Sequence, residues 1–249
     1  MAGIRADLPD TRVHPPGRHQ GNLMKTQNTE HAPSKGAMAL FRRTALRCVR
    51  PLQGFLRRRR VDLFLQLARS TGGGSVLDVG GWHGLAGEFQ RLYESFDTVT
   101  IANLRTDSNG PTHPHVRRVA ADGCALPFKP HAFEWVFSNA VIEHVGSWEK
   151  QRQFAEEVRR VAKEGYFVAT PNRNFPIEPH TLVPFYQFMS PGLQRVALRL
   201  SPGYLAMYYE QINLLSARQL GTLFPEAQIL KTGPPGLPNV LVAFYRSTS

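Results

Sequence analysis

Residues 75–84 read SVLDVGGWHG and lead directly into LAGEFQRLYES at residues 85–95. An apolar run passes into a glycine-rich turn, and apolar residues then recur at helical spacing, so we expect a strand, a tight turn and a helix. Glycines let a ligand approach the backbone closely, and the following helix offers unpaired N–H groups and a positive dipole end. An ordinary strand–helix turn is the alternative. Asp78 favours a ligand site, because a carboxylate buried in an apolar strand needs turn amides or a cationic ligand as partners.

The same stretch resembles the first motif of class I S-adenosylmethionine-dependent methyltransferases. In that motif an acid is followed by glycines at the second, fourth and sixth positions after it. Asp78, Gly80 and Gly84 match this pattern, and Trp82 stands where the middle glycine is expected.

A second region strengthens the resemblance. ADGCALPF at residues 121–128, followed by HAFEWVFSNAVIEHV at residues 131–145, is similar to the D-A-x-x-L-P-F, F-D-x-V and E-H-V pattern of the type 11 small-molecule branch. The resemblance covers about residues 70–247.

This resemblance implies an α/β fold with a Rossmann-like, doubly wound, seven-stranded sheet, mostly parallel with an antiparallel final hairpin. The residues alone point the same way, because the last two strands are joined by GPPGLPN, which is too short for a crossover helix and forces antiparallel pairing. The apolar pattern predicts strands at residues 76–79, 98–104, 116–121, 133–138, 165–170, 227–231 and 240–245. It predicts helices at residues 148–163 and 216–223, the second with Ser216 as its N-cap.

The resemblance also implies S-adenosyl-L-methionine as the cofactor. The residues that would bind it are Asp78, Gly80, Gly84, Asn103, Asp122, Gly123 and Cys124. Asn103 stands where the family carries an acid for the ribose hydroxyls; an amide can accept one hydrogen bond and donate another, without charge assistance. Asp122 and the two residues after it would line the adenine, and the alternative is that Asp122 caps the glycine turn.

Two histidines are candidate bases. His144 follows Glu143 in the loop after the fourth strand, at the edge of the sheet where ligands bind, and an imidazole can take a proton from a hydroxyl near neutral pH. The alternative is that the E-H-V turn orders its loop. Some family members use E-x-x-E-H to hold a divalent cation, but Ala140 replaces the first Glu here, so no metal is predicted.

His180 is the second candidate base, with Glu178 beside it, in an insert at about residues 171–210 that should cover the acceptor pocket. Both side chains could instead tie the loop together. The prolines of residues 171–185 predict a loop rather than a regular helix or inner strand, and its many aromatic residues favour an ordered one. Similar stretches occur in type 11 relatives associated with cell-surface sugars and lipids.

The positive charge is concentrated at the start of the chain. The net charge is +11, and residues 1–60 contain 13 Lys and Arg against 3 acids, while residues 61–249 contain 17 against 16. A nucleic-acid enzyme usually carries its positive field on the domain that meets the phosphates, so the split argues against nucleic acid as a partner.

We expect a disordered tail at residues 1–37, a basic amphipathic helical arm at 38–69 and a methyltransferase domain at 70–249. Pro51 and Gly54 weaken the middle of the arm, so its helix is expected to restart at Val61. The arm suits peripheral contact with an anionic membrane through residues 38–60, or packing across the domain as a lid or brace.

The two cysteines, Cys48 and Cys124, are too few for a disulfide framework, which favours a reducing compartment. No run of eighteen apolar residues occurs, and the N-terminus lacks the form of a secretory signal. The expected location is therefore cytoplasmic, or peripheral at the inner face of a membrane.

These observations favour O-methylation of a small molecule, sugar or lipid-linked glycan. One alternative is an RNA methyltransferase that docks through the basic arm, against which the charge split speaks. Another is a non-catalytic binding or scaffold protein, favoured by Trp82 and Asn103. A nicotinamide oxidoreductase is disfavoured, because the turn lacks G-x-G-x-x-G spacing.

Overall fold

The computed structural model describes residues 54–68, 74–81, 89–105, 114–178, 181, 183–200 and 212–248. The predicted tail at residues 1–37, and the part of the arm before residue 54, lie outside the described residues.

A seven-stranded sheet organises the described residues, with the strand order β3-β2-β1-β4-β5-β7-β6. β1 to β5 run parallel, and β7 pairs antiparallel with both β5 and β6. The strands are β1 Ser75–Val79, β2 Thr98–Asn103, β3 Val116–Ala120, β4 Phe133–Asn139, β5 Ala162–Pro171, β6 Gln228–Thr232 and β7 Val240–Arg246. The predicted fold, including its antiparallel final hairpin, is therefore confirmed.

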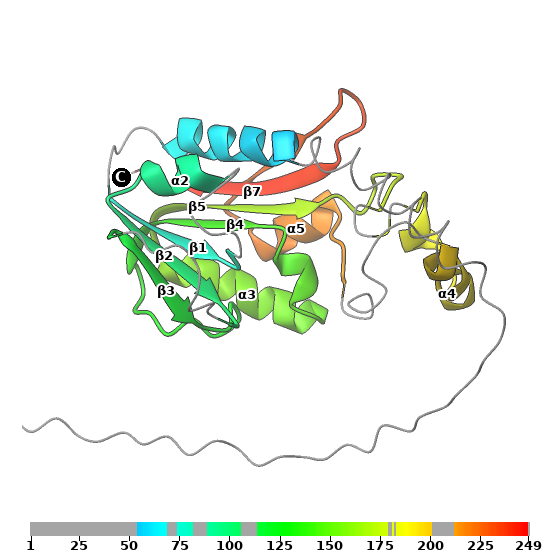
Figure 1. Ribbon diagram of the computed structural model, residues 1–249, viewed down its shortest axis with the longest axis horizontal. Coiled ribbons are helices and arrows are strands. Elements are labelled where there is room, and N and C mark those ends of the chain that lie inside the picture. The colour runs from blue at the N-terminus through cyan, green and yellow to red at the C-terminus, as the bar shows by residue number, and fades with distance from the viewer. Residues whose placement is uncertain are drawn as a thin grey trace, which may run out of the picture. The chain divides into compact units, whose positions relative to one another are not determined.

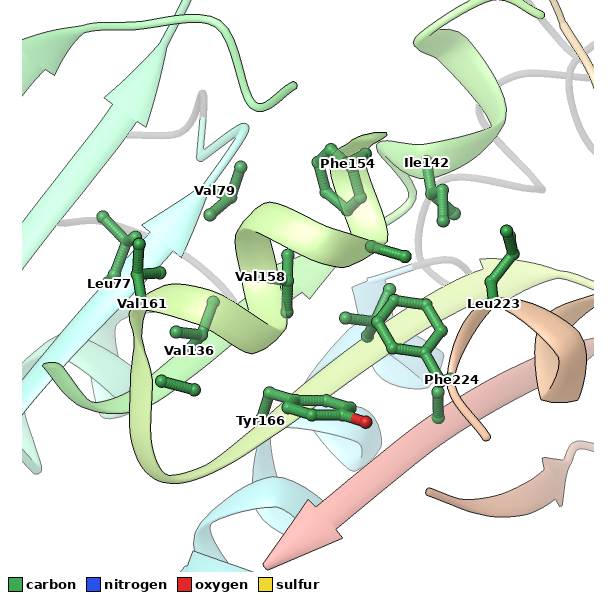
Figure 2. Close-up of a cluster of buried hydrophobic side chains, with 14 of the residues drawn as sticks. Leu77, Val79, Val136, Ile142, Phe154, Val158, Val161, Tyr166, Leu223 and Phe224 are labelled. Atoms are coloured by element: carbon green, nitrogen blue, oxygen red, sulfur yellow. The ribbon is translucent and has the colours of Figure 1, made fainter. Parts of the chain in front are cut away.

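Helices cover both faces of this sheet (Figure 1). The N-terminal helix, residues 54–68, lies on one face with α2 (Gln90–Glu94), and α3 (Trp148–Val161) and α5 (Ala217–Leu223) lie on the other. Two buried apolar clusters follow from this arrangement, one on each side of the sheet. Figure 2 shows the α3 side, where Phe154 and Val158 point between the helix and the strands.

The N-terminal helix packs through a regular apolar stripe. Val61, Phe64, Leu65 and Ala68 are buried, with spacings of three and four residues that place them on one side of a helix. Phe64 contacts the rings of Phe96, Trp135, Phe137 and Phe167, with centroids 5.2–6.0 Å away.

The expected break in this helix is absent among the described residues. The helix runs without interruption from residue 54 to 68, so a restart at Val61 was a wrong prediction. Gly54 is buried at the beginning of the described helix, where its helix-weakening effect does not interrupt the turns that follow.

The described residues of the proline-rich stretch after β5 (172–178, 181 and 183–185) contain no helix or strand, as predicted, and regular structure resumes after it. Pro171 is the last residue of β5 and pairs with Val240, beyond the end of the β4 pairing, where a missing N–H disturbs no inner ladder. A short 3-10 helix, η4 (Tyr186–Phe188), precedes α4 (Pro191–Leu200). Pro191 occupies the first helical position, which proline tolerates because the N–H there has no intrahelical partner.

The described aromatic residues of the insert differ in how far they are buried. Tyr186 is 1% exposed, whereas Phe185 and Phe188 are 59% and 55% exposed. The expectation of an ordered insert rested on the cost of exposing aromatic side chains, and these two phenylalanines are exposed nonetheless.

Candidate active site

The candidate site lies at the carboxyl edge of the parallel strands. Gly80 follows β1, Asn103 ends β2 and Asn139 ends β4. β1 sits between β2 and β4, so the connections leave it in opposite directions and open a crevice above the strand ends. Two cavities, of about 170 and 400 Å³, lie at this edge, and Gly80 and Ala140 line both of them.

Asp78 is a buried acid that lines the smaller cavity. Its side chain is buried, and the Tyr93 hydroxyl donates to its Oδ2 over 2.6 Å. Burial raises the pKa of Asp78 to about 6, against the opposing effect of the Tyr93 hydrogen bond. Burial, and then the negative charge of Asp78, raise the pKa of Tyr93 as well. The partner of the buried acid is thus a phenol of α2, which the sequence alone did not identify.

The two glycines after β1 are required by packing. Gly80 has φ 83°, and a methyl group there would overlap the Val141 side chain. A methyl group on Gly81 would overlap the Asp78 carboxylate. The backbone therefore passes close over the acid, as a turn that holds a ligand must.

Asn103 is tied to this turn. Its Nδ2 donates to the Gly81 carbonyl oxygen over 3.2 Å, and the residue lines the larger cavity. Asn103 and Asp122 both line that cavity.

Asp122 caps its turn, which was the alternative prediction for it, and also lines a cavity, while its contact with the adenine stays a prediction. Its Oδ1 accepts the Cys124 backbone N–H over 2.9 Å, so it caps the turn, yet its side chain is exposed and lines the larger cavity. Gly123 is needed there because a methyl group would lie 2.8 Å from the Phe154 ring. The Cys124 thiol contacts the Lys150 carbonyl oxygen at 3.3 Å, and burial together with Asp122 raises its pKa to about 11, so it stays protonated at neutral pH.

His144 lies at the end of η3 (Ile142–His144) and lines the larger cavity with Asp122. Its Nε2 lies 3.9 Å from Oε1 of Glu143. Glu143 is fully buried, and its Oε2 accepts from the Thr170 hydroxyl over 2.9 Å. The structure thus brings the candidate base to the same crevice as the predicted cofactor residues.

Hydrogen bonds from Gln151 and Asn213 also hold the turn that contains Glu143 and His144. The Gln151 side-chain amide donates to the Ile142 and Asn213 carbonyl oxygens, and the Asn213 backbone N–H donates to the Glu143 carbonyl oxygen. This arrangement supports the loop-ordering alternative for the motif, and it leaves the His144 imidazole, which is 37% exposed, facing the cavity.

The N-terminal helix contributes residues that sequence reasoning missed. Arg57 lines the smaller cavity with Asp78 and Asn139, and Arg60 donates from Nε to Oδ1 of Asn139 over 2.8 Å. Burial, and then the neighbouring Arg57, lower the pKa of Arg60 to about 10, while Glu143 acts in the opposite sense. The i, i+3 spacing of the two arginines was the available signal, but a four-arginine run reads first as a membrane-facing or solvated surface.

Some predictions cannot be placed. Gly84 and His180, with Trp82, lie outside the described residues. Glu178 is buried, and its Oε2 accepts from the Thr181 backbone N–H and hydroxyl over 2.6 and 2.9 Å, so it ties the loop together.

No group of three His, Cys, Asp or Glu side chains among the described residues could hold a metal ion. Among those same residues, every helix is too short or too polar to cross a bilayer.

Residues 84–169 match the family model described as a methyltransferase domain. The N-methyltransferase NodS from Bradyrhizobium japonicum WM9, in complex with S-adenosyl-L-homocysteine, is 12% identical with a TM-score of 0.50, covering 77% of this chain and 87% of NodS. The Burkholderia thailandensis 1,6-didemethyltoxoflavin-N1-methyltransferase is 15% identical with a TM-score of 0.49, covering 90% and 94%. No curated protein matches significantly.

Proposed function

We propose that this class I S-adenosylmethionine-dependent methyltransferase methylates an oxygen atom of a small molecule, and that its cofactor lies across the two cavities that meet at Gly80 and Ala140. The observation that carries the proposal is the position of Asp78, Asn103 and Asp122 around one continuous strand edge. The proposal includes the chain division given above, with the tail at residues 1–37, the arm at 38–69 and the methyltransferase domain from residue 70.

The residues present fit this cofactor. Asp78 and the backbone of Gly80 and Gly81 offer negative charge and close approach at one end, which suits the cationic part of the methionine moiety. Arg57 lines the same cavity and would hold its carboxylate. Asn103 would accept from a ribose hydroxyl, and Asp122, with Gly123 and Cys124, would line the adenine. Gly84 remains part of the proposed cofactor turn.

The bound cofactor would supply an activated methyl group and its own leaving group. The task of the chain is therefore to align the acceptor oxygen and to exclude water. His144 would remove the proton of the acceptor hydroxyl through its imidazole, which faces the larger cavity. His180 remains the second candidate for this step.

The acceptor class rests on the insert after β5. Its similarity to relatives associated with cell-surface sugars and lipids supports a sugar or lipid-linked glycan. A cytoplasmic location, and contact of residues 38–60 with an anionic membrane, also belong to this proposal, supported by the basic charge of the arm.

Calorimetric titration of the full chain with S-adenosyl-L-homocysteine tests the cofactor site. We expect micromolar binding, reduced at least tenfold by Asp78→Ala, with Glu94→Ala as a matched control because Glu94 is an exposed acid at the end of α2. A folded chain that binds no cofactor at millimolar concentration would contradict the proposal and favour the scaffold alternative. Salt-sensitive RNA binding by the cofactor-binding chain would favour the RNA alternative instead.

A further inference from the structure

A third cavity borders the N-terminal helix on the side away from its core stripe. It measures about 610 Å³ and lies between this helix and the β6–β7 connection, which Figure 1 shows in red beside the beginning of the cyan helix. The helix residues that line it, spaced mostly three and four apart, are Leu56, Arg59, Arg60, Asp62, Leu63 and Gln66. A cavity of this size can hold a metabolite-sized molecule.

The polar lining of this cavity has an excess of cationic donors. Arg59 and Arg60 supply two guanidinium groups, and Asn239 adds an amide. Asp62 is the acid in the lining, and its Oδ1 pairs with Arg91 Nη1 at 2.5 Å. The negative charge of Asp62 is therefore already partnered, which leaves the arginines to attract an anion.

Arg60 connects this cavity with the predicted cofactor site. Its Nε donates to Asn139, and Asn139 lines the smaller cavity with Asp78 and Arg57. A molecule in the third cavity is thus one side chain away from the strand edge where the cofactor is proposed to lie. Burial, and then the nearby Arg57, lower the pKa of Arg60, and a bound anion would relieve the repulsion from Arg57.

We propose that an anionic part of the acceptor, a carboxylate or a phosphate, lies in the third cavity and is bound there by Arg59 and Arg60, while its reacting hydroxyl lies in the larger cavity with His144. Guanidinium groups suit both, because their paired N–H groups match two oxygens of either anion. This inference rests on the proposed methyltransferase function and narrows its acceptor to an anionic molecule. The apolar lining from Leu56, Leu63 and Pro234 would contact the uncharged part of that molecule.

The test uses neighbouring arginines on one helix. The full chain is titrated calorimetrically with inorganic phosphate and, separately, with acetate, at constant ionic strength set by chloride. We expect millimolar binding of at least one anion, weakened about tenfold or more by Arg59→Gln, since a charge-assisted hydrogen bond is worth about 1.5–3 kcal/mol. Arg58→Gln makes the same charge change at an exposed residue that is not among those lining this cavity, and should leave binding unchanged.

The outcomes separate this inference from the function on which it rests. Equal losses in Arg59→Gln and Arg58→Gln would show general charge attraction and overturn it, as would no binding of either anion up to about 50 mM. The phosphate and acetate arms identify which oxyanion is preferred. S-adenosyl-L-homocysteine is titrated in parallel: cofactor binding without anion binding overturns the acceptor inference alone, whereas absent cofactor binding contradicts the proposed function. Unchanged thermal unfolding of both variants confirms that they remain folded.

Discussion

Asp78 shows, at the scale of one residue, what burying an acid costs. The carboxylate is buried, so its charged form is disfavoured and its pKa lies near 6 rather than 3.8. The folded chain therefore holds a proton that the unfolded chain releases between these two values. Its contribution to the free energy of unfolding is present below about pH 4 and is lost as the pH rises through about 6.

We predict that Asp78→Asn stabilises the chain above pH 7 and has little effect near pH 3.5. The shift from 3.8 to about 6 corresponds to at most about 3 kcal/mol of free energy of unfolding at pH 8. Urea denaturation at both pH values measures this difference. Glu94→Gln, the same change at an exposed position, should shift neither value, and a destabilised Asp78→Asn variant at pH 8 would contradict the prediction.

The affinity for S-adenosyl-L-methionine should depend on the same proton. If Asp78 holds the cationic end of the cofactor, affinity is constant above pH 7 and falls by up to about tenfold per pH unit below 6, as the carboxylate protonates. Tyr93→Phe removes the hydrogen bond that lowers this pKa, so the midpoint should move to higher pH. Titrations from pH 5 to 8 measure both curves, and an affinity independent of pH would exclude this contact.

At the scale of the element, the N-terminal helix shows how one segment serves core and site together. Its buried stripe packs on the sheet, while Arg57 and Arg60 face the candidate site. The sequence predicted an amphipathic helix here, but could not tell which surface its polar side faces. That choice depends on which strands lie beneath it.

We predict that Phe64→Ala lowers the free energy of unfolding by about 3–5 kcal/mol, because the ring is fully buried among four other rings. Phe55→Ala on the same helix, where the ring is 49% exposed and lies 5.6 Å from the Arg59 guanidinium, should cost less than about 1 kcal/mol. Chemical denaturation of both variants checks the difference, and similar losses would mean that the helix does not pack as described.

For the whole molecule, the sequence predicted those elements that depend on the residues of a single short stretch. The strands, α3 and the Ser216 cap follow from apolar periodicity and turn chemistry, and all of them are found within a few residues of the expected bounds. The cavity positions of Asn103 and Asp122 follow because parallel strands end at one edge. Contacts between distant segments, such as Tyr93 with Asp78 and Arg60 with Asn139, depend on side-chain packing that no single stretch encodes.

The cofactor should also change how the whole domain resists cleavage. Because Arg57 and Asp78 line one cavity from two segments, bound S-adenosyl-L-homocysteine would join the helix to the sheet. We predict that trypsin cleavage at residues 57–60 slows at least tenfold in saturating S-adenosyl-L-homocysteine, while cleavage at the exposed Arg195 of α4 changes less. Mass spectrometry of the timed digest gives both rates, and equal slowing at the two places would contradict a specific link.

The ring cluster around Phe64 limits which parts of the third cavity's wall can move. Residues 61–68 cannot leave the sheet without exposing that cluster. We therefore expect this half of the helix to stay in place on the sheet. Any widening of the third cavity must then come from the first turns of the helix or from the β6–β7 connection opposite them. If the third cavity binds the anionic part of the acceptor as proposed, that part would enter and leave beside Arg59 and Arg60, so the same two charges would act on its approach as well as on its binding.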